Sequence, residues 1–249
     1  MKKVKYTRDI IHTGYCILVN QFHPYVENKC LMNLVPLQYE PTIYLNMDAN
    51  DALNQIMEKI NGWDSIVPIS GYRSFEEQSK LYKQSLLENG EEFTSKFVAL
   101  PGCSEHQTGL AIDLALKTDD IDFICPDFPY EGVCQRFRDL APLYGFIERY
   151  GKKVESITHI AHEPWHFRYV GYPHSLIMKE LGMCLEEYCE YIQTRLDDEN
   201  VLVYKKDDES CEVSYIPCVD NELEVMMDDK SKWSLSGDNC EGLIYVQFR

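Results

Sequence analysis

Two segments of this chain are the most informative: SEHQTGLAID, residues 104–113, and HEPWHFRYV, residues 162–170. Each segment places ionisable or metal-binding side chains inside a run that is otherwise apolar. Asp113 lies within LAIDLAL, residues 110–116, the most apolar stretch near it. A buried carboxylate without a partner is strongly unfavourable, so Asp113 requires either a nearby cation or a proton.

The natural co-ligands of Asp113 are two histidines on these same segments. His106 precedes Asp113 by seven residues, and His166 stands next to an aromatic run predicted to be a strand. Two imidazoles and one carboxylate suit catalytic zinc, which keeps a fourth position open. Glu163 is not needed as a ligand and is free to act as a base. The sequence therefore predicts a Zn²⁺ site made of His106, Asp113 and His166.

The segment HEPWH, residues 162–166, also matches the H-E-x-x-H zinc signature, in which both histidines align on one helix. Pro164 removes a backbone donor and disfavours helical geometry at Glu163. The segment also runs directly into HFRYV, which has the composition of a strand. We therefore reject the helical interpretation and expect His166 to be a ligand, with His162 in a structural or supporting role.

A second group of candidate site residues follows the β-rich run SIVPIS at 65–70. Ser74 and the glutamate three residues later form a capping box, which predicts that a helix begins here. Arg73 then stands at the mouth of this helix, where it can point into the cleft. Gln78 lies on the inward face of the same helix. Trp165 can form a wall of the pocket, although an ordinary core residue would look the same.

Apolar spacing along the chain mixes helices with strands. It predicts helices over 50–60, 74–87, 133–144, 174–181 and 185–196, strands over 65–70, 110–116 and 166–170, and loops over 91–103 and 117–132. After residue 198 the chain shows short β-prone runs separated by polar turns. We therefore predict an α+β fold with a catalytic domain over 1–198 and a small β-rich C-terminal subdomain over 199–249.

The chain is acidic, with 41 Asp and Glu against 24 Lys and Arg and a formal net charge of −17. Nucleic acid and anionic membrane both require a basic surface, so neither is expected as a partner. No segment approaches the roughly 18 apolar residues that span a bilayer. The ten cysteines are scattered without C-x-x-C pairs, as expected for reduced core thiols. We expect a cytoplasmic protein without membrane insertion.

Three motifs, taken together, resemble a known family. They are GYRS-x-x-x-Q at 71–78, S-x-H-x-x-G-x-A-x-D at 104–113 and E-x-W-H at 163–166. In this order and spacing they resemble the zinc D-alanyl-D-alanine peptidases of the LAS group, the VanX/VanY-like metallopeptidases. The longer stretches SGYRS, SEHQTGLAIDL, PDFPY and HEPWHFRYVGYPHS are similar to the VanXY-type proteins of glycopeptide resistance, particularly the VanG type.

The resemblance implies an LAS-type α+β fold with a central antiparallel sheet flanked by helices. It implies a zinc D,D-dipeptidase/D,D-carboxypeptidase that acts on D-Ala-D-Ala and peptidoglycan pentapeptide precursors and is linked to vancomycin resistance. The zinc ligands implied are those named above, with Glu163 as the base and Arg73 as the cation that stabilises the carbonyl. Gln78 and Ser104 correspond to polar positions of the family's pocket, and we expect these two residues and Trp165 to bind the substrate.

Two alternatives stay open at this point. One is an L,D-carboxypeptidase or cell-wall endopeptidase that uses the same zinc core. The other is a non-catalytic, zinc-containing peptidoglycan-binding module, against which the intact Glu163 and Arg73 argue. The sequence does not determine the oligomeric state.

Overall fold

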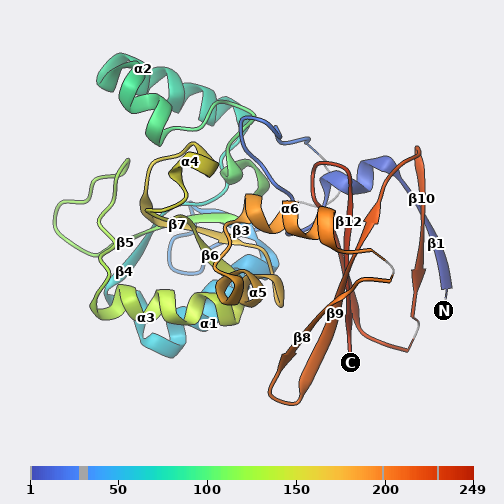
Figure 1. Ribbon diagram of the computed structural model, residues 1–249. Coiled ribbons are helices and arrows are strands. Elements are labelled where there is room, and N and C mark those ends of the chain that lie inside the picture. The colour runs from blue at the N-terminus through green and yellow to red at the C-terminus, as the bar shows by residue number, and fades with distance from the viewer. Residues whose placement is uncertain (1, 28–32, 198, 229) are drawn as a thin grey trace. The chain divides into compact units, whose positions relative to one another are not determined.

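The structure is a computed structural model that describes residues 2–27, 33–197, 199–228 and 230–249. The chain divides into two compact units (Figure 1). The larger unit comprises residues 19–25 and 32–179. The smaller unit comprises residues 1–18, 26–31 and 180–249.

The larger unit is built, over its described residues, on a four-stranded antiparallel sheet. The strands lie in the order β4 (Ile66–Ser70), β5 (Ala111–Leu116), β7 (Glu163–Tyr169) and β6 (Phe146–Tyr150). Each neighbouring pair is antiparallel. This arrangement confirms the predicted central antiparallel sheet, and the strand that starts at Glu163 confirms that HEPWH is not helical.

Alternation along the strands separates a core face from a site face. Ile112 and Leu114 of β5, with Trp165 and Phe167 of β7, belong to one hydrophobic cluster. Successive side chains of a strand point to opposite faces. Asp113 of β5 and its register partner His166 of β7 are therefore directed away from that core. The sheet therefore buries one face and offers the other to polar chemistry.

Two helices cover the core face of the sheet. They are α1 (Met47–Ile60) and α3 (Gly132–Leu140), and the 3₁₀ turn η4 (Ala141–Tyr144) continues α3. Leu53 and Ile56 of α1 and Phe137 of α3 are fully buried in the same cluster as the sheet residues. Figure 1 shows α1 and α3 on one side of the sheet and α2 on the other.

The helix α2 (Phe75–Phe97) begins at the predicted capping box. The backbone N–H of Ser74 donates to the Glu77 carboxylate, and the backbone N–H of Glu77 donates to the Ser74 hydroxyl. Gly90 interrupts it with φ 80° and ψ 173°, and helical geometry then resumes as far as Phe97. The predicted loop over 91–103 is therefore wrong in its first half. A buried hydrogen bond of 2.7 Å between the Ser85 and Thr94 hydroxyls ties the two helical parts together.

The remaining elements of this part of the chain are short. They are β2 (Leu34–Pro36), β3 (Tyr44–Asn46), η2 (Gly62–Asp64), η3 (Glu105–Thr108), α4 (Glu155–Thr158) and α5 (His174–Leu181). β2 and β3 form an antiparallel pair. The residues 117–131 form no helix or strand, as the polar composition predicts.

The smaller unit is rich in strands. Its elements are β1 (Lys2–Thr7), η1 (Arg8–His12), α6 (Leu185–Arg195), β8 (Leu202–Lys206), β9 (Glu209–Pro217), β10 (Glu222–Met227), β11 (Trp233–Gly237) and β12 (Gly242–Phe248). One sheet has the order β11-β12-β9-β8, and the other pairs β1 with β10. The short β-prone runs predicted after residue 198 are strands in the structure, among them β8, β9, β10 and β12.

The compact units divide the chain differently from the predicted boundary at 198/199. The N-terminal strand β1 pairs along its whole length with β10, from Lys2 opposite Met227 to Thr7 opposite Glu222. An ion pair between Lys3 and Glu224 links the same two strands. A partner more than 200 residues away leaves no local pattern in the sequence, so composition alone marked only the C-terminal part of this unit.

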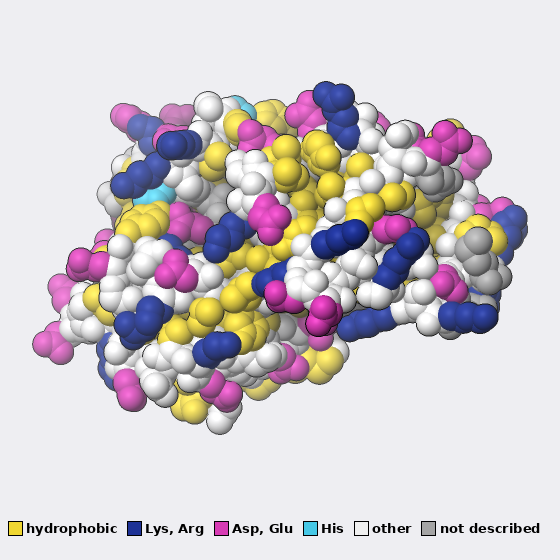
Figure 2. Space-filling model, turned by 60° about the horizontal axis from the view of Figure 1, so that its bottom comes forward, with side chains coloured by type: hydrophobic (Ala, Val, Ile, Leu, Met, Phe, Trp, Pro, Cys, Tyr) yellow, Lys and Arg dark blue, Asp and Glu magenta, His cyan; other side chains and the backbone are white. Residues whose placement is uncertain are grey.

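On the face that Figure 2 presents, acidic and basic side chains are interspersed over the described residues rather than gathered by sign. None of the described helices is long and apolar enough to cross a membrane.

Gly71, between β4 and α2, provides a test of the packing that positions the site. A Cβ atom there would lie 2.4 Å from the backbone oxygen of Tyr44 and 2.7 Å from Cγ2 of Ile43. We expect Gly71→Ala to lower the free energy of unfolding by about 1–3 kcal/mol, as overpacking does. Gly151→Ala is the matched control, because a Cβ there meets nothing within 4 Å. Equal urea unfolding curves for the two variants would contradict this packing.

Candidate metal centre

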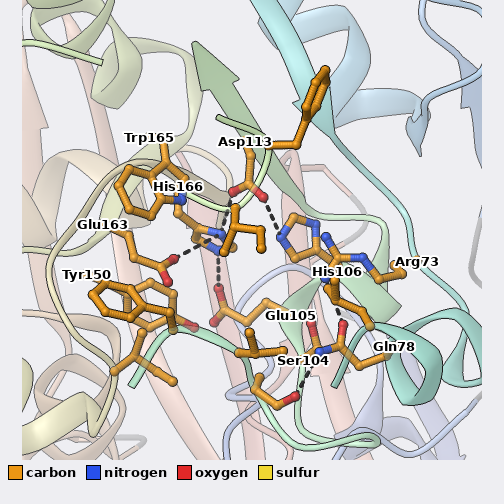
Figure 3. Close-up of a pocket in the computed structure, with 17 residues that line it drawn as sticks. Arg73, Gln78, Ser104, Glu105, His106, Asp113, Tyr150, Glu163, Trp165 and His166 are labelled. Carbon is orange, nitrogen blue, oxygen red and sulfur yellow. Dashed lines mark hydrogen bonds and ion pairs between the residues drawn. The ribbon is translucent and has the colours of Figure 1, made fainter. Parts of the chain in front are cut away.

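A single pocket of the larger unit is lined by every side chain that the sequence predicted for the site (Figure 3). These are Arg73, Gln78, Ser104, His106, Asp113, Glu163, Trp165 and His166. Glu105 and Tyr150 also line this pocket. The residues come from β5, β6 and β7 and from the chain at the beginnings of η3 and α2, so the fold brings together segments that are far apart in the sequence.

The geometry centres on Asp113, which lies between two imidazoles. Asp113 and His166 are register partners on β5 and β7. Nδ1 of His166 is 2.8 Å from one oxygen of Asp113, and Nε2 of His106 is 3.1 Å from the other. One donor atom from each residue lies within 4.8 Å of the others, and no other such group of three occurs among the described residues.

The orientation of His106 is set by the backbone around it. His106 lies in η3, which ends at Gly109 with φ 70°. Its Nδ1 is 2.6 Å from the backbone oxygen of Gly71. Because a carbonyl oxygen only accepts, Nδ1 carries the proton and Nε2 keeps its lone pair toward Asp113. A ligand histidine anchored in this way by its second nitrogen is typical of zinc sites.

The donor set fits a divalent cation. Burial alone would raise the pKa of Asp113, but the charges and hydrogen bonds of His106 and His166 hold that pKa well below its usual range. Burial would lower the pKa of His166, yet Asp113 outweighs it and raises the value to about 10. The site therefore favours positive charge between these groups. Two imidazole nitrogens and one carboxylate are ligands that zinc prefers.

Glu163 lies beside this group without belonging to it. Its side chain is buried, and its Oε2 is 3.9 Å from Nδ1 of His166. Burial raises the pKa of Glu163 to about 8, partly offset by His166 and reinforced by Asp113. A carboxyl group in a pocket with a pKa near neutrality is suited to taking up and releasing a proton.

Arg73 is held at the pocket by polar partners on both sides. Its Nη1 donates to Gln78 Oε1 at 2.8 Å, and its Nη2 donates to Ser70 Oγ at 2.6 Å. Gln78 is itself fixed by donating to the backbone oxygen of Ala99 at 2.7 Å. Burial lowers the pKa of Arg73, while Asp113 and other carboxylates oppose this effect. The guanidinium is therefore a fixed cation next to the carboxylates of the site.

Three buried charged residues behind His166 were not among the site residues predicted from the sequence. Glu105 occupies a variable position of the motif, but its side chain is fully buried. Arg149 Nε donates to Glu105 Oε1 at 2.8 Å, and Arg168 Nη1 lies 2.8 Å from the same oxygen. Arginines inside the strand-like runs FIERY and HFRYV carry the same signal of a buried charge that identified Asp113. That signal could have found this cluster.

The lining of this pocket does not include His162, Arg138 or Cys103. His162 faces Tyr130, whose hydroxyl is 2.7 Å from Nε2, and the two rings stack. Arg138 donates to the backbone oxygen of Pro164 at 2.7 Å and thereby anchors the start of β7. Burial raises the pKa of the Cys103 thiol, which does not favour a reactive thiolate.

Comparison with known proteins identifies close relatives. The family model described as VanY, D-alanyl-D-alanine carboxypeptidase, matches residues 42–172. The bifunctional D-Ala-D-Ala dipeptidase and D-Ala-D-Ala carboxypeptidase VanXYC of Enterococcus gallinarum is 41% identical over 177 residues, which cover 70% of this chain and 93% of that protein.

Two solved structures show the same fold. The vancomycin resistance D,D-dipeptidase VanXYg, in complex with a D-Ala-D-Ala phosphinate analog, matches with a TM-score of 0.97 and 46% identity, over 100% of this chain and 99% of that one. The second is a mutant of the D,D-pentapeptidase VanY from a VanB-type resistance cassette, in complex with Zn(II). It matches with a TM-score of 0.56 and 26% identity, over 70% of this chain and 98% of that one.

The raised pKa of Glu163 predicts a pH-dependent stability of the metal-free protein. Folding raises this pKa from 4.5 to about 8, so the stability contributed by Glu163 is present below pH 4.5 and lost as the pH rises through about 8. Glu163→Gln cannot ionise. We expect it to gain stability relative to the unmodified protein between pH 5 and 9, by at most about 5 kcal/mol at about 1.4 kcal/mol per pKa unit.

Urea unfolding in the presence of a chelator measures this difference. Glu91→Gln is the matched control, because Glu91 is an exposed carboxylate on α2. We expect its stability relative to the unmodified protein to stay constant over the same range. A Glu163→Gln difference that is equally flat would mean that Glu163 is ionised in the folded, metal-free protein.

Proposed function

Since this chain belongs to the VanY family of D-alanyl-D-alanine carboxypeptidases, we propose that it is a zinc-dependent D,D-dipeptidase and D,D-carboxypeptidase. Its proposed substrates are D-Ala-D-Ala and D-Ala-terminated peptidoglycan precursors, in the context of vancomycin resistance. The observation that carries the proposal is the convergence of His106, Asp113 and His166, with Glu163 beside them and outside the group.

The zinc ion would be held by Nε2 of His106, a carboxylate oxygen of Asp113 and Nδ1 of His166. These three atoms face one another, and the donor set is that of catalytic zinc sites with three protein ligands. When bound, zinc supplies Lewis-acid chemistry: it lowers the pKa of a water molecule toward neutrality and polarises the scissile carbonyl group.

Glu163 moves the proton in this proposal. Its carboxylate accepts a proton from the attacking water as the water oxygen bonds to the carbonyl carbon of the amide. The same carboxyl group then donates that proton to the departing amine nitrogen as the C–N bond breaks. One water is consumed, and D-Ala-D-Ala yields two D-alanines. The raised pKa of Glu163 supports this double role, because a carboxyl group near neutrality both accepts and releases a proton.

Arg73 stabilises the negative charge that develops on the carbonyl oxygen. Gln78 and Ser70 hold its guanidinium in place, so little reorganisation is needed during the reaction. Both polar ends of the Gln78 amide are engaged, one by Arg73 and one by Ala99, so we assign its contribution to substrate binding to this positioning of Arg73. Ser104 and Trp165 are proposed to contact the substrate from the pocket wall.

The cellular setting is part of the same proposal. The cysteines in the described part of the chain are free thiols. Free thiols are typical of a reducing compartment, which supports cytoplasmic peptidoglycan precursors as substrates. The excess of acidic residues argues against nucleic acid as a partner.

Substrate profiling of zinc-loaded protein separates this function from its rivals. We expect release of D-alanine from D-Ala-D-Ala and from a pentapeptide ending in D-Ala-D-Ala, and little release from a tetrapeptide whose terminal bond is L,D. Preference for the tetrapeptide would support an L,D-carboxypeptidase instead. Zinc binding without hydrolysis of any of the three would support a non-catalytic module.

Two substitutions separate the ligand role from the base role. We expect Glu163→Ala to retain zinc and to lose turnover by about 100-fold or more, since general acid–base catalysis contributes roughly that much. We expect Asp113→Ala to lose both zinc and turnover, because it removes a ligand. Zinc content by mass spectrometry and D-alanine release measure the two effects. Near-normal hydrolysis by Glu163→Ala would mean that another group is the base.

Arg73 is tested by comparison with an arginine outside the pocket. We expect Arg73→Ala to retain zinc and to lower kcat on the order of 100-fold, as removal of an oxyanion stabiliser does. Arg73→Lys keeps the charge but not the two-pronged geometry, so it should restore only part of the rate. Arg136→Ala is the control, because Arg136 is exposed on α3. A kcat for Arg73→Ala equal to that control would remove Arg73 from the mechanism.

A further inference from the structure

A buried ionic cluster lies directly behind His166. The imidazole of His166 has a carboxylate at each ring nitrogen: Asp113 is 2.8 Å from Nδ1, and Glu105 Oε2 is 3.4 Å from Nε2. Figure 3 shows Glu105 and Asp113 on opposite sides of the ring. The contact at Nε2 is at the long end of hydrogen-bond distances. His166 is therefore placed between the metal site and a second carboxylate that does not belong to it.

The two arginines dictate how Glu105 can act. Arg149 from β6 and Arg168 from β7 each form an ion pair of 2.8 Å with Oε1 of Glu105. All three side chains are fully buried. A guanidinium only donates and carries a positive charge, so two of them beside one oxygen favour the ionised form of the Glu105 carboxylate. The other oxygen, Oε2, faces His166 and can only accept. The proton of the neutral imidazole is then favoured on Nε2, which leaves the lone pair of Nδ1 directed toward Asp113.

We propose that Glu105 is a positioning residue: clamped by Arg149 and Arg168, it holds His166 in the tautomer whose Nδ1 can bind the metal. This inference rests on the proposed zinc site. It gives the cluster a function beyond charge neutralisation, because it couples β6 to a ligand on β7. Carboxylate partners of metal-binding histidines typically change metal affinity by about 10–100-fold when removed.

The substitution Glu105→Gln separates positioning from a purely structural role. The amide oxygen of glutamine would turn to the two guanidinium groups, because only that atom can accept from them. The amide nitrogen would then point its protons at Nε2 of His166. That arrangement favours the opposite tautomer, with a proton on Nδ1 directed into the metal site. A structural role alone predicts lower stability but no selective loss of metal binding.

The experiment measures zinc affinity by competition with a chelator, alongside the thermal unfolding of the same variants. We expect Glu105→Gln to bind zinc about 10–100-fold more weakly and to change the visible absorption spectrum of the Co²⁺-substituted protein. Glu148→Gln is the matched control: Glu148 lies on β6 of the same sheet, and the change removes its carboxylate from a 2.7 Å ion pair with Arg138 of α3. We expect its zinc affinity to stay within about twofold of the unmodified protein.

A second measurement uses the unmodified protein, so its result does not depend on whether Glu105→Gln folds. Long-range ¹H–¹⁵N correlation spectra of the unmodified, zinc-loaded protein show which nitrogen of His166 carries the proton. A proton on Nε2 supports the inference, and a proton on Nδ1 overturns it. If Glu105→Gln binds zinc as tightly as the unmodified protein, the inference fails while the proposed function stands. If the unmodified protein binds no zinc, the proposed function fails, and this inference fails with it.

Discussion

The pairing of β5 with β7 is the constraint on which the site depends. It sets Asp113 opposite His166, two residues that are 53 positions apart in the chain. A register shift by one residue would turn one of these side chains toward the hydrophobic core. Ile112 and Phe167, packed in that core, oppose such a shift. The apolar packing on one face of the sheet therefore determines the chemistry on the other.

Acidic and basic side chains alternate outward from Asp113. The carboxylate is flanked by two imidazoles, and behind His166 lies Glu105, which is in turn held by Arg149 and Arg168. Each buried group has a partner, and removing one partner of a buried pair is typically strongly destabilising, by about 3–5 kcal/mol. Such a network is stiff. Stiffness suits a site whose ligands and base must keep fixed positions through a reaction.

Much of this arrangement can be predicted from local sequence, and the remainder fails for identifiable reasons. Asp113 within an apolar run indicates by itself that a cation or a proton lies beside it. Pro164 within HEPWH excludes by itself the helical form of the zinc signature. Glu105 was missed because one ionisable residue next to a ligand is unremarkable until its arginines, about 44 and 63 positions away, are seen beside it. The helix predicted over 74–87 is too short, because a further helical part follows Gly90 and a buried hydroxyl pair links it to the first part. The β1–β10 pairing depends on a partner at the far end of the chain.

The central claim is that His106, Asp113 and His166 bind one metal ion while Glu163 does not. An anomalous difference map from crystals of the zinc-loaded protein, recorded at the zinc absorption edge, tests it most directly. The account predicts a single peak bonded to Nε2 of His106, a carboxylate oxygen of Asp113 and Nδ1 of His166, with Glu163 nearby but not bonded. A peak that lacks Asp113 among its ligands, or that has Glu163 in its place, would contradict the account.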